Sequence, residues 1–215
     1  MIRVSQDKAI DDATRAALAS GRAEPALSLF IDTLMEMRGI SDREGEMVAG
    51  AALESETPAA MSSSALDMAF AAIERGGKAV RPRQLNYPEL AGLPVALREL
   101  ILDAEGQHDW SYAGPGIRRL DLGAKGPLKL EVIRLDAGKA VPWHSHKGRE
   151  LTLCIQGEFS DAAATYGPGD FSVTDGTVRH QPRAQDSAPA YALAVTDAGL
   201  RFEGVLGALQ KIFGQ

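Results

Sequence analysis

The sequence is poor in cysteine, in aromatic residues and in long apolar runs. It has 215 residues, 6% of them aromatic, and a single cysteine, Cys154, so no disulfide can form within the chain. We find no run of about 20 apolar residues, which a membrane-spanning helix requires, and no apolar segment typical of a secretory signal at the N-terminus. These absences favour a cytoplasmic protein that does not associate with membranes.

Clustered positive charge is also missing. The 29 acidic residues outnumber the 23 basic ones, so the net charge is −6. Binding to nucleic acid or to an anionic membrane depends on grouped Lys and Arg side chains, and we therefore expect no direct contact with nucleic acid. Apolar residues make up 45% of the chain and charged residues 24%, which is typical of a globular protein.

The first third of the chain is rich in Ala, Met, Glu and Leu, which favour helices. Pro25 suits the first position of a helix that Gly39 can end. Ser41 and Ser64 each precede an acidic residue by three positions, a pattern that predicts two further helix starts. Four helices are therefore expected in residues 1–77, at about residues 11–20, 25–39, 41–55 and 65–75.

The remaining chain has a different composition. Residues 78–90 carry two prolines and three basic residues and are interpreted as a linker. From residue 107 to 204 short apolar runs alternate with Gly and Pro turn signals every 8–12 residues, which indicates a β-sandwich or barrel. We therefore predict a two-domain α+β chain: a helical domain at 1–77, the linker, and a β domain at 91–215 with short helices at about 93–102 and 205–213.

Three histidines and one glutamate form the strongest candidate site. His144 and His146 are two residues apart, so on a strand both side chains point to one face. Glu150 follows at an even spacing and can reach the same point after a turn, and His180 arrives from a separate strand. Three imidazoles and a carboxylate suit zinc, iron, manganese, nickel or copper. These four residues are the candidate metal ligands.

The spacing around these residues has a family pattern. Gly138 lies six residues before His144, Gly157 lies seven after Glu150, and Gly169 lies eleven before His180. With these glycines, residues 107–200 resemble a cupin, a small double-stranded β-helix barrel. The second motif departs from the pattern, because Asp175-Gly176-Thr177 replaces its usual proline and glycine turn.

The arrangement of helices, linker, cupin and the ending Leu200–Phe213 resembles the ChrR-type anti-sigma factors. This resemblance implies that the helical domain binds an extracytoplasmic-function (ECF) sigma factor. It also implies that the cupin binds zinc and is needed for release of the sigma factor in response to singlet oxygen or related oxidants. An apolar stripe spaced for docking in a groove is the candidate sigma-binding face, although it could equally form the core of the domain: Leu27, Phe30, Ile31 and Leu34.

The N-terminal part departs from that family in its ligands. Zinc-type anti-sigma domains carry a His-x3-Cys-x2-Cys pattern, and its place here is held by Thr33, Met37 and Ile40. None of these is a normal zinc ligand. We therefore expect the helical domain to be held together by apolar packing instead of zinc.

Two other functions remain open. A site of three histidines and one carboxylate also resembles cupin dioxygenases that use iron, nickel or manganese, and a small-molecule binding module is a third alternative. No catalytic residue is assigned under the regulator hypothesis. Cys154 is expected to be a buried apolar residue, and Asp161 is expected to be solvated beside a hairpin.

Overall fold

The computed structural model describes residues 24–40, 47, 50–51, 53–74 and 83–202. The chain divides into two compact units, one comprising residues 42–84 and the other comprising residues 1–41 with 85–215. The helices expected at 11–20 and 205–213 lie outside the described residues, as does much of the helix expected at 41–55. Within the described residues, no helix has both the length and the apolar character needed to cross a membrane.

The helices that are described begin and end close to where the sequence places them. Helix α2 (Pro25–Met37) has Pro25 in its first turn. Gly39 ends it with a φ of 62°, and the amides of Gly39 and Ile40 donate to the carbonyls of Glu36 and Met35. This pairing is the Schellman motif, which favours glycine. Helices α4 (Ala65–Glu74) and α5 (Val95–Glu105) also match the predicted positions.

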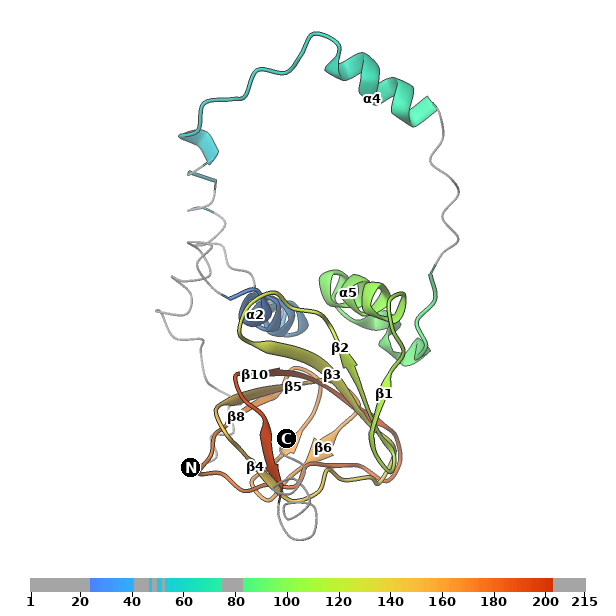
Figure 1. The fold of residues 1–215 in the computed structure, drawn as a ribbon, viewed down its shortest axis with the longest axis vertical. Coiled ribbons are helices and arrows are strands. Elements are labelled where there is room, and N and C mark those ends of the chain that lie inside the picture. Colours follow the sequence, from blue (N-terminus) through green and yellow to red (C-terminus); the bar gives the residue numbers. More distant parts are fainter. Residues whose placement is uncertain (1–23, 41–46, 48–49, 52, 75–82, 203–215) are drawn as a thin grey trace. The chain divides into compact units, whose positions relative to one another are not determined.

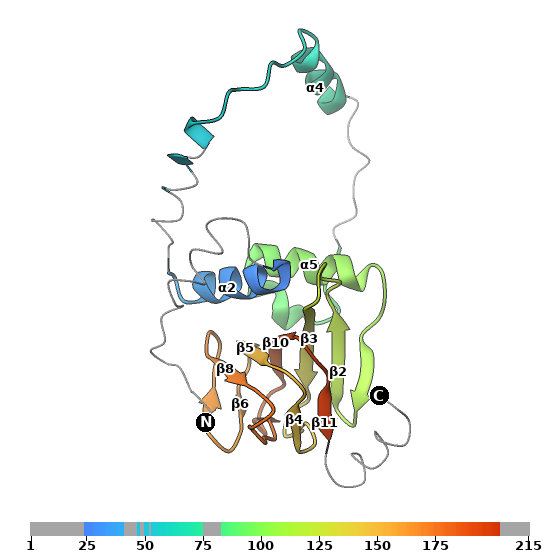
Figure 2. The same ribbon diagram turned by 60° about the vertical axis from the view of Figure 1, so that its left-hand side comes forward.

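The β region is an antiparallel sandwich (Figures 1 and 2). One layer is a six-stranded sheet in the order β1-β2-β3-β10-β5-β8, and the other side holds the sheets β11-β4 and β7-β6-β9. The strands are β1 (Ser111–Gly114), β2 (Ile117–Asp121), β3 (Lys129–Leu135), β4 (His144–His146), β5 (Glu150–Gln156), β6 (Phe159–Ser160), β7 (Thr165–Tyr166), β8 (Phe171–Thr174), β9 (Arg183–Ala184), β10 (Ala190–Thr196) and β11 (Leu200–Phe202).

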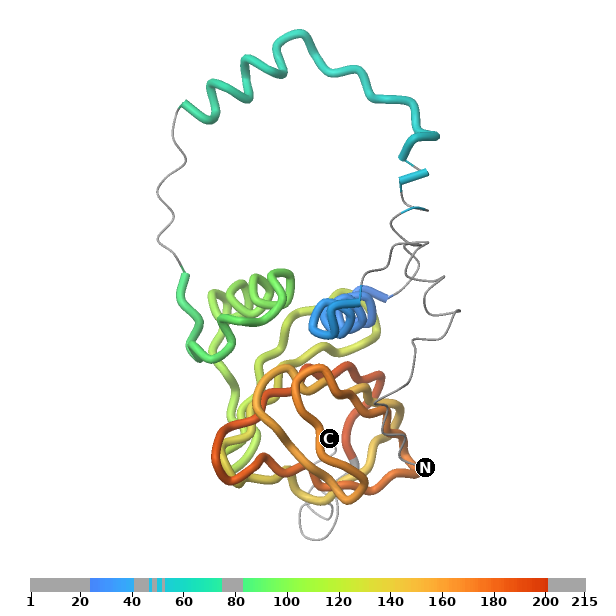
Figure 3. The backbone as a smooth tube through the Cα atoms, turned by 180° about the vertical axis from the view of Figure 1, so that it is seen from behind, coloured from blue at the N-terminus to red at the C-terminus, as the bar shows by residue number. Residues whose placement is uncertain are grey.

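The outer face of the six-stranded sheet carries large apolar side chains, and α2 and α5 lie across it (Figure 3). Leu153 and Leu193 from the central strands pack with Phe30 of α2 and Leu97 of α5, all of them buried. The Phe30 and Phe171 rings meet edge to face, with centroids 6.2 Å apart. This layer of helix on sheet is the larger core of the described chain.

The inner face of the same sheet carries smaller side chains. Because side chains alternate along a strand, Ala190 and Ala192 point inward from β10, while Thr152 and Cys154 point inward from β5. Phe159 and the β6, β7 and β9 strands pack against part of this face. Small residues on the central strands leave space elsewhere between the layers, and the candidate site lies there.

Part of the segment expected to be a linker is folded. Pro88–Gly92 form a 3-10 helix, η1, in which Leu90 is completely buried in the outer core. The hydroxyl of Tyr191 on β10 donates to Glu89 and accepts a hydrogen bond of 2.9 Å from Arg134 Nε. These contacts join residues 85–93 to the sandwich, and α2 belongs to the same unit. The observed grouping therefore differs from the division at 77 and 90 that composition suggests.

Helix α4, in the unit of residues 42–84, carries an apolar stripe of exposed side chains. Leu66, Phe70 and Ile73 are 60%, 56% and 73% exposed. They follow the i, i+4, i+7 spacing that places side chains on one face of a helix. None of the residues in α4 is buried, in contrast to the stripe of α2.

Candidate metal centre

Two of the four candidate ligands come from one short strand. His144 and His146 begin and end β4, with Ser145 between them pointing the other way. Both histidines are buried, at 3% and 1% exposure. Strand β4 pairs with β11, where His144 lies opposite Phe202 and His146 opposite Leu200. The alternation of side chains on a strand therefore directs both imidazoles into the space between the sheets, as the sequence predicts.

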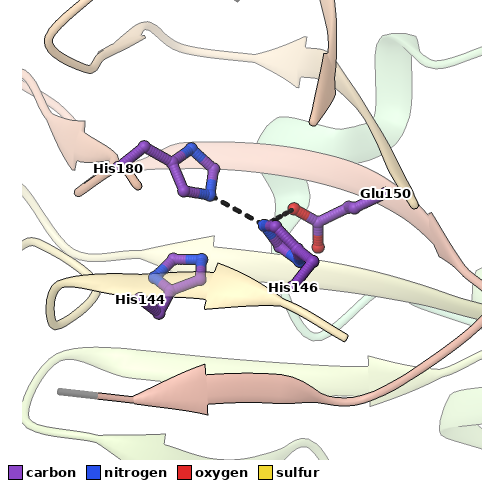
Figure 4. Close-up of side chains that lie close together, drawn as sticks. All are labelled: His144, His146, Glu150 and His180. Carbon is purple, nitrogen blue, oxygen red and sulfur yellow. Dashed lines mark hydrogen bonds and ion pairs between the residues drawn. The ribbon is translucent and has the colours of Figure 1, made fainter. Parts of the chain in front are cut away.

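The other two ligands reach this space from different strands. Glu150 is the first residue of β5, where Thr196 of β10 and Thr174 of β8 flank it. His180 pairs with His144 in an isolated bridge, in which the amide of each histidine donates to the carbonyl of the other at 3.2 and 3.0 Å. Both side chains are buried. Three separate segments thus bring four donor groups together (Figure 4).

Distances between the donor atoms fit a shared ion. One donor atom from each of the four side chains lies within 4.8 Å of the other three. His146 Nε2 is 2.9 Å from His180 Nε2 and 3.3 Å from Glu150 Oε2 (Figure 4). Zinc–nitrogen bonds measure about 2.0–2.1 Å, so two ligands of one ion lie about 3.0–3.4 Å apart. The two separations at His146 are therefore close to those of ligands that share one ion.

Hydrogen bonding around the rings also suits ligation. His144 Nδ1 is 2.8 Å from the carbonyl oxygen of Pro142, so Nδ1 carries the proton and donates, and the lone pair is on Nε2. His180 Nδ1 lies 3.5 Å from Asp161 Oδ2. A partner at one nitrogen fixes the tautomer and the orientation of the ring. In His144 that partner is at Nδ1, which would direct Nε2 to a metal ion.

Burial keeps the imidazoles of His144 and His146 in the neutral form that binds metals. Loss of water contact lowers the pKa of His144 to about 4 and that of His146 to about 3. Burial also raises the pKa of Glu150 to about 7, although the nearby His180 and a hydrogen bond from Thr152 oppose this shift. A divalent cation would favour the ionised carboxylate by direct attraction. The donors present thus fit a divalent metal ion.

Asp161 is the participant that sequence reasoning missed. We expected it to be solvated, but its side chain is only 1% exposed. Burial alone would raise its pKa, but the contacts with His180 and with the backbone amides of Ala163 and Ala164 outweigh this effect and hold the pKa below its usual value. The sequence offers no signal for this role, because Asp161 and His180 are distant along the chain.

A pocket adjoins the metal centre. His144, Glu150 and Thr152 are its polar lining residues, and its free volume is about 490 Å³ when the opening to solvent is included. The other lining residues are apolar and come from both layers of the sandwich: Ile133, Leu135, Val141, Phe159, Pro182, Ala190, Ala192 and Leu200.

The turn residues are placed as the motif spacing predicts. Gly138, Gly157 and Gly169 have φ values of 68°, 72° and 88°, a region that favours glycine. A Cβ on Gly157 would lie 2.2 Å from the carbonyl oxygen of Pro189. The turn Asp175-Gly176-Thr177, which replaces the usual proline and glycine turn of the second motif, is held by its own side chains. Asp175 Oδ1 accepts hydrogen bonds from the amide and the hydroxyl of Thr177.

Cys154 is fully buried in the inner cluster, as expected. Burial raises the pKa of its thiol to about 12. The thiolate is the reactive form of cysteine, so this residue is poorly suited to redox chemistry in the folded chain.

The apolar stripe of α2 is not available as a docking face in this structure. Phe30, Ile31 and Leu34 are at most 3% exposed, and Leu27 is partly buried against the same core. The stripe forms core because the outer face of the sheet presents a matching apolar surface. In this structure the stripe therefore forms core, which is the alternative that the sequence left open.

Thr33, Met37 and Ile40 stand where zinc-type anti-sigma domains have their ligands, and they lie in α2 or just after it. Thr33 is buried, Met37 packs against the outer core, and Ile40 is largely exposed. Helix α2 is held by apolar contacts with the sheet and α5. A hydrogen bond of 2.8 Å from Arg38 Nε to the carbonyl of Gly169 adds a polar tie.

Comparison with known proteins extends the likeness over most of the chain. Residues 99–196 match the family described as the ChrR cupin-like domain. The chain is 30% identical over 207 residues to the anti-sigma-E factor ChrR of Cereibacter sphaeroides, which covers 95% of this chain and 96% of that protein.

A solved structure matches as well. The crystal structure of Rhodobacter sphaeroides SigE in complex with the anti-sigma ChrR matches with a TM-score of 0.58 and 28% identity, covering 87% of this chain and 97% of that one. The sequence match therefore spans both the N-terminal third of the chain and the region of the four candidate ligands. The chain belongs to the ChrR family of anti-sigma factors with a cupin-like domain.

Proposed function

We propose that this protein is an anti-sigma factor that binds an ECF sigma factor and keeps it from RNA polymerase. The observation that carries this proposal is the similarity to an anti-sigma factor over 95% of the chain. A cupin-like domain alone would say little, because one fold hosts many functions. The relative in the matching crystal structure is bound to a sigma factor, which supports the same class of partner here and a cytoplasmic site of action.

The contact with the sigma factor is assigned to the helix stripe that the chain leaves exposed. Leu66, Phe70 and Ile73 of α4 have the spacing of anchors that dock into an apolar groove. Contact through α2 would require Phe30 and Leu34 to leave the sheet. Exposing each of these side chains would cost about 1.5–3 kcal/mol. Helix α4 is therefore the better candidate for the sigma-binding face, and α2 supports the sandwich.

The second part of the proposal concerns the metal. His144, His146, Glu150 and His180 would hold one divalent ion, with zinc favoured by the family and iron, manganese or nickel compatible with the same donors. When bound, the ion would cross-link three segments of the β domain. We also propose that the sandwich closes around it as the double-stranded β-helix barrel of cupins.

The third part concerns the signal. Imidazole rings are oxidisable, and three of the four donors are imidazoles, two on β4 and one on the His180 segment. Damage to one ring by singlet oxygen or a related oxidant would weaken the cage. We propose that this loosening releases the sigma factor. The dioxygenase alternative has less support, because the relative that matches along the whole chain is a regulator.

A binding measurement tests the proposal. Purified full-length chain, loaded with zinc, is mixed under reducing conditions with each ECF sigma factor of the same organism, and complexes are detected by size-exclusion chromatography. One sigma factor should bind, and exposure to light with a singlet-oxygen sensitiser should release it. Failure of every sigma factor to bind would contradict the proposal.

A further inference from the structure

Trp143 combines an oxidisable ring with exposure to solvent, directly beside the candidate metal centre. Its side chain is 39% exposed, whereas the three imidazoles of the candidate site are at most 3% exposed. The chain has one other tryptophan, Trp110, which is buried at 7% exposure. A short-lived oxidant that arrives from solvent therefore meets the ring of Trp143 before it meets the candidate ligands.

The backbone at Trp143 joins two parts of the candidate site. Trp143 directly precedes the ligand His144 in the chain. The peptide that leads into Trp143 carries the carbonyl oxygen of Pro142, which lies 2.8 Å from His144 Nδ1 and fixes the orientation of that ring. Because both groups are covalently attached to Trp143, a change in the conformation of Trp143 displaces the ligand and its orienting partner together.

The indole also contacts the segment that carries a second ligand. The guanidinium carbon of Arg179 lies 4.7 Å from the centroid of the Trp143 ring, a distance at which a cation is attracted to the π electrons. Arg179 directly precedes His180, whose backbone exchanges two hydrogen bonds with that of His144. The imidazoles of His144 and His180 are buried, with ring centroids 4.4 Å apart, while Trp143 and Arg179 are exposed. The stacked pair thus supports the same bridge from its solvent side.

We infer that Trp143 is a site of oxidation by singlet oxygen, and that its oxidation loosens the metal cage. This inference rests on the proposed metal site and the proposed response to oxidants, and it names the residue that is attacked. Dioxygen in its singlet state adds across the C2=C3 bond of the indole. That bond and the O–O bond then break, and each of the two carbons becomes a carbonyl. Both oxygen atoms stay on the residue, no proton leaves, and no second reactant is needed.

The product, N-formylkynurenine, cannot replace the indole in the contact with Arg179. The fused ring is opened, and the remaining benzene ring carries an electron-withdrawing carbonyl, which weakens its attraction for a cation. The opened side chain is also more polar and has more rotatable bonds. The bridge between His144 and His180 therefore loses its support from the solvent side, and the two ligands are held less firmly.

Illumination of the zinc-loaded full chain with the sensitiser rose bengal gives two independent readouts. Release of zinc is followed with a chromogenic chelator, and oxidation of each tryptophan is measured by mass spectrometry of tryptic peptides. We expect Trp143 to gain the mass of two oxygen atoms while buried Trp110 stays unmodified over the same interval. Zinc should leave at the rate at which Trp143 is modified, and azide, which quenches singlet oxygen, should suppress both changes.

Two variants test the role of the stacked pair. Trp143→Phe keeps an aromatic ring for Arg179 and removes the reactive indole, so most of the light-dependent zinc release should disappear while zinc content in the dark is unchanged. Arg179→Gln keeps the indole, which should be oxidised as in the wild type. It removes the cation, so zinc should leave about two- to fivefold faster in the dark, as expected for loss of an exposed cation–π contact. Arg149→Gln, at an exposed arginine beside Glu150, is the control for loss of charge and should leave the dark rate unchanged.

The outcomes separate this inference from the proposals on which it rests. A chain that takes up no zinc contradicts the metal site and this inference together, and light that changes neither Trp143 nor the bound zinc contradicts the proposed response as well. Zinc release with Trp143 unmodified, or equal release from Trp143→Phe and the wild type, overturns this inference alone. Retention of zinc by chains with oxidised Trp143 overturns the link to the cage, and a dark rate unaffected by Arg179→Gln overturns the role of the stacked pair.

Discussion

The two faces of the six-stranded sheet are similarly buried but have different chemistry. On the outer face Leu153, Leu193 and their neighbours pack against two helices. On the inner face Ala192, Thr152 and Glu150 border a pocket, and Glu150 also belongs to the candidate metal centre. Large side chains fill the space between elements and stabilise the fold, whereas small ones leave space beside the buried polar groups of the candidate site. The outer face of these strands thus contributes to stability, and the inner face carries the candidate site.

The largest expected effect is on the outer face. Phe30→Ala removes a buried ring that meets Phe171, and it should lower the free energy of unfolding by about 3–5 kcal/mol. Urea denaturation followed by circular dichroism would measure this change. The matched control is Phe70→Ala on α4, where the exposed ring should change the stability by less than about 0.5 kcal/mol. Equal losses of unfolding free energy in the two variants would show that burial of Phe30 against the outer face does not stabilise the fold.

On the inner face, removing a ligand should abolish metal binding. His180→Ala deletes an imidazole whose Nε2 is 2.9 Å from His146 Nε2. We expect zinc to fall from one equivalent per chain to a small fraction of one, measured by elemental analysis after purification without added metal. His108→Ala, at an exposed histidine outside the site, is the control. Retention of one full equivalent by the His180 variant would show that the ion is held elsewhere.

A smaller loss is expected at the carboxylate behind His180. Asp161→Asn removes the charge that faces His180 Nδ1 at 3.5 Å. Such partners of ligating histidines typically contribute about 10–100-fold in metal affinity. Competition with a chromogenic zinc chelator would measure the change, and Glu158→Gln, an exposed carboxylate nearby, serves as the control. A zinc affinity equal to that of the wild type would mean that Asp161 does not position the ring.

The smallest effect on stability is expected at α4. Replacing both Leu66 and Ile73 with Ala should leave the midpoint of urea unfolding almost unchanged, because both side chains are already exposed. Val95, an exposed apolar residue on α5, provides a control of similar exposure. A clear destabilisation by the α4 changes would show that this stripe is covered within the chain and is not available to a partner.

Features with local causes could be predicted from the sequence. The bounds of α2 follow from Pro25 and Gly39, and the convergence of His144 with His146 follows from the alternation of side chains on a strand. The glycine spacing also located Glu150 and His180. Each of these features depends on the conformation of a few neighbouring residues, or on a motif whose turns require glycines with positive φ at fixed positions.

Features that depend on distant partners could not be predicted. Helices α2 and α4 have similar apolar stripes, yet the first is core and the second is exposed. The pattern shows that a helix has an apolar face, but it does not show what covers that face. Burial of Asp161 against His180 and of Leu90 in the outer core likewise depends on contacts between separate parts of the chain.

The most direct test of the account is the affinity of the full chain for its cognate sigma factor when α4 alone is changed. Leu66→Glu combined with Ile73→Glu should weaken the complex at least about 100-fold in a titration calorimeter, while Val95→Glu should not, with zinc content and unfolding midpoint preserved in both. Undiminished binding of the sigma factor by the α4 variant would contradict the account.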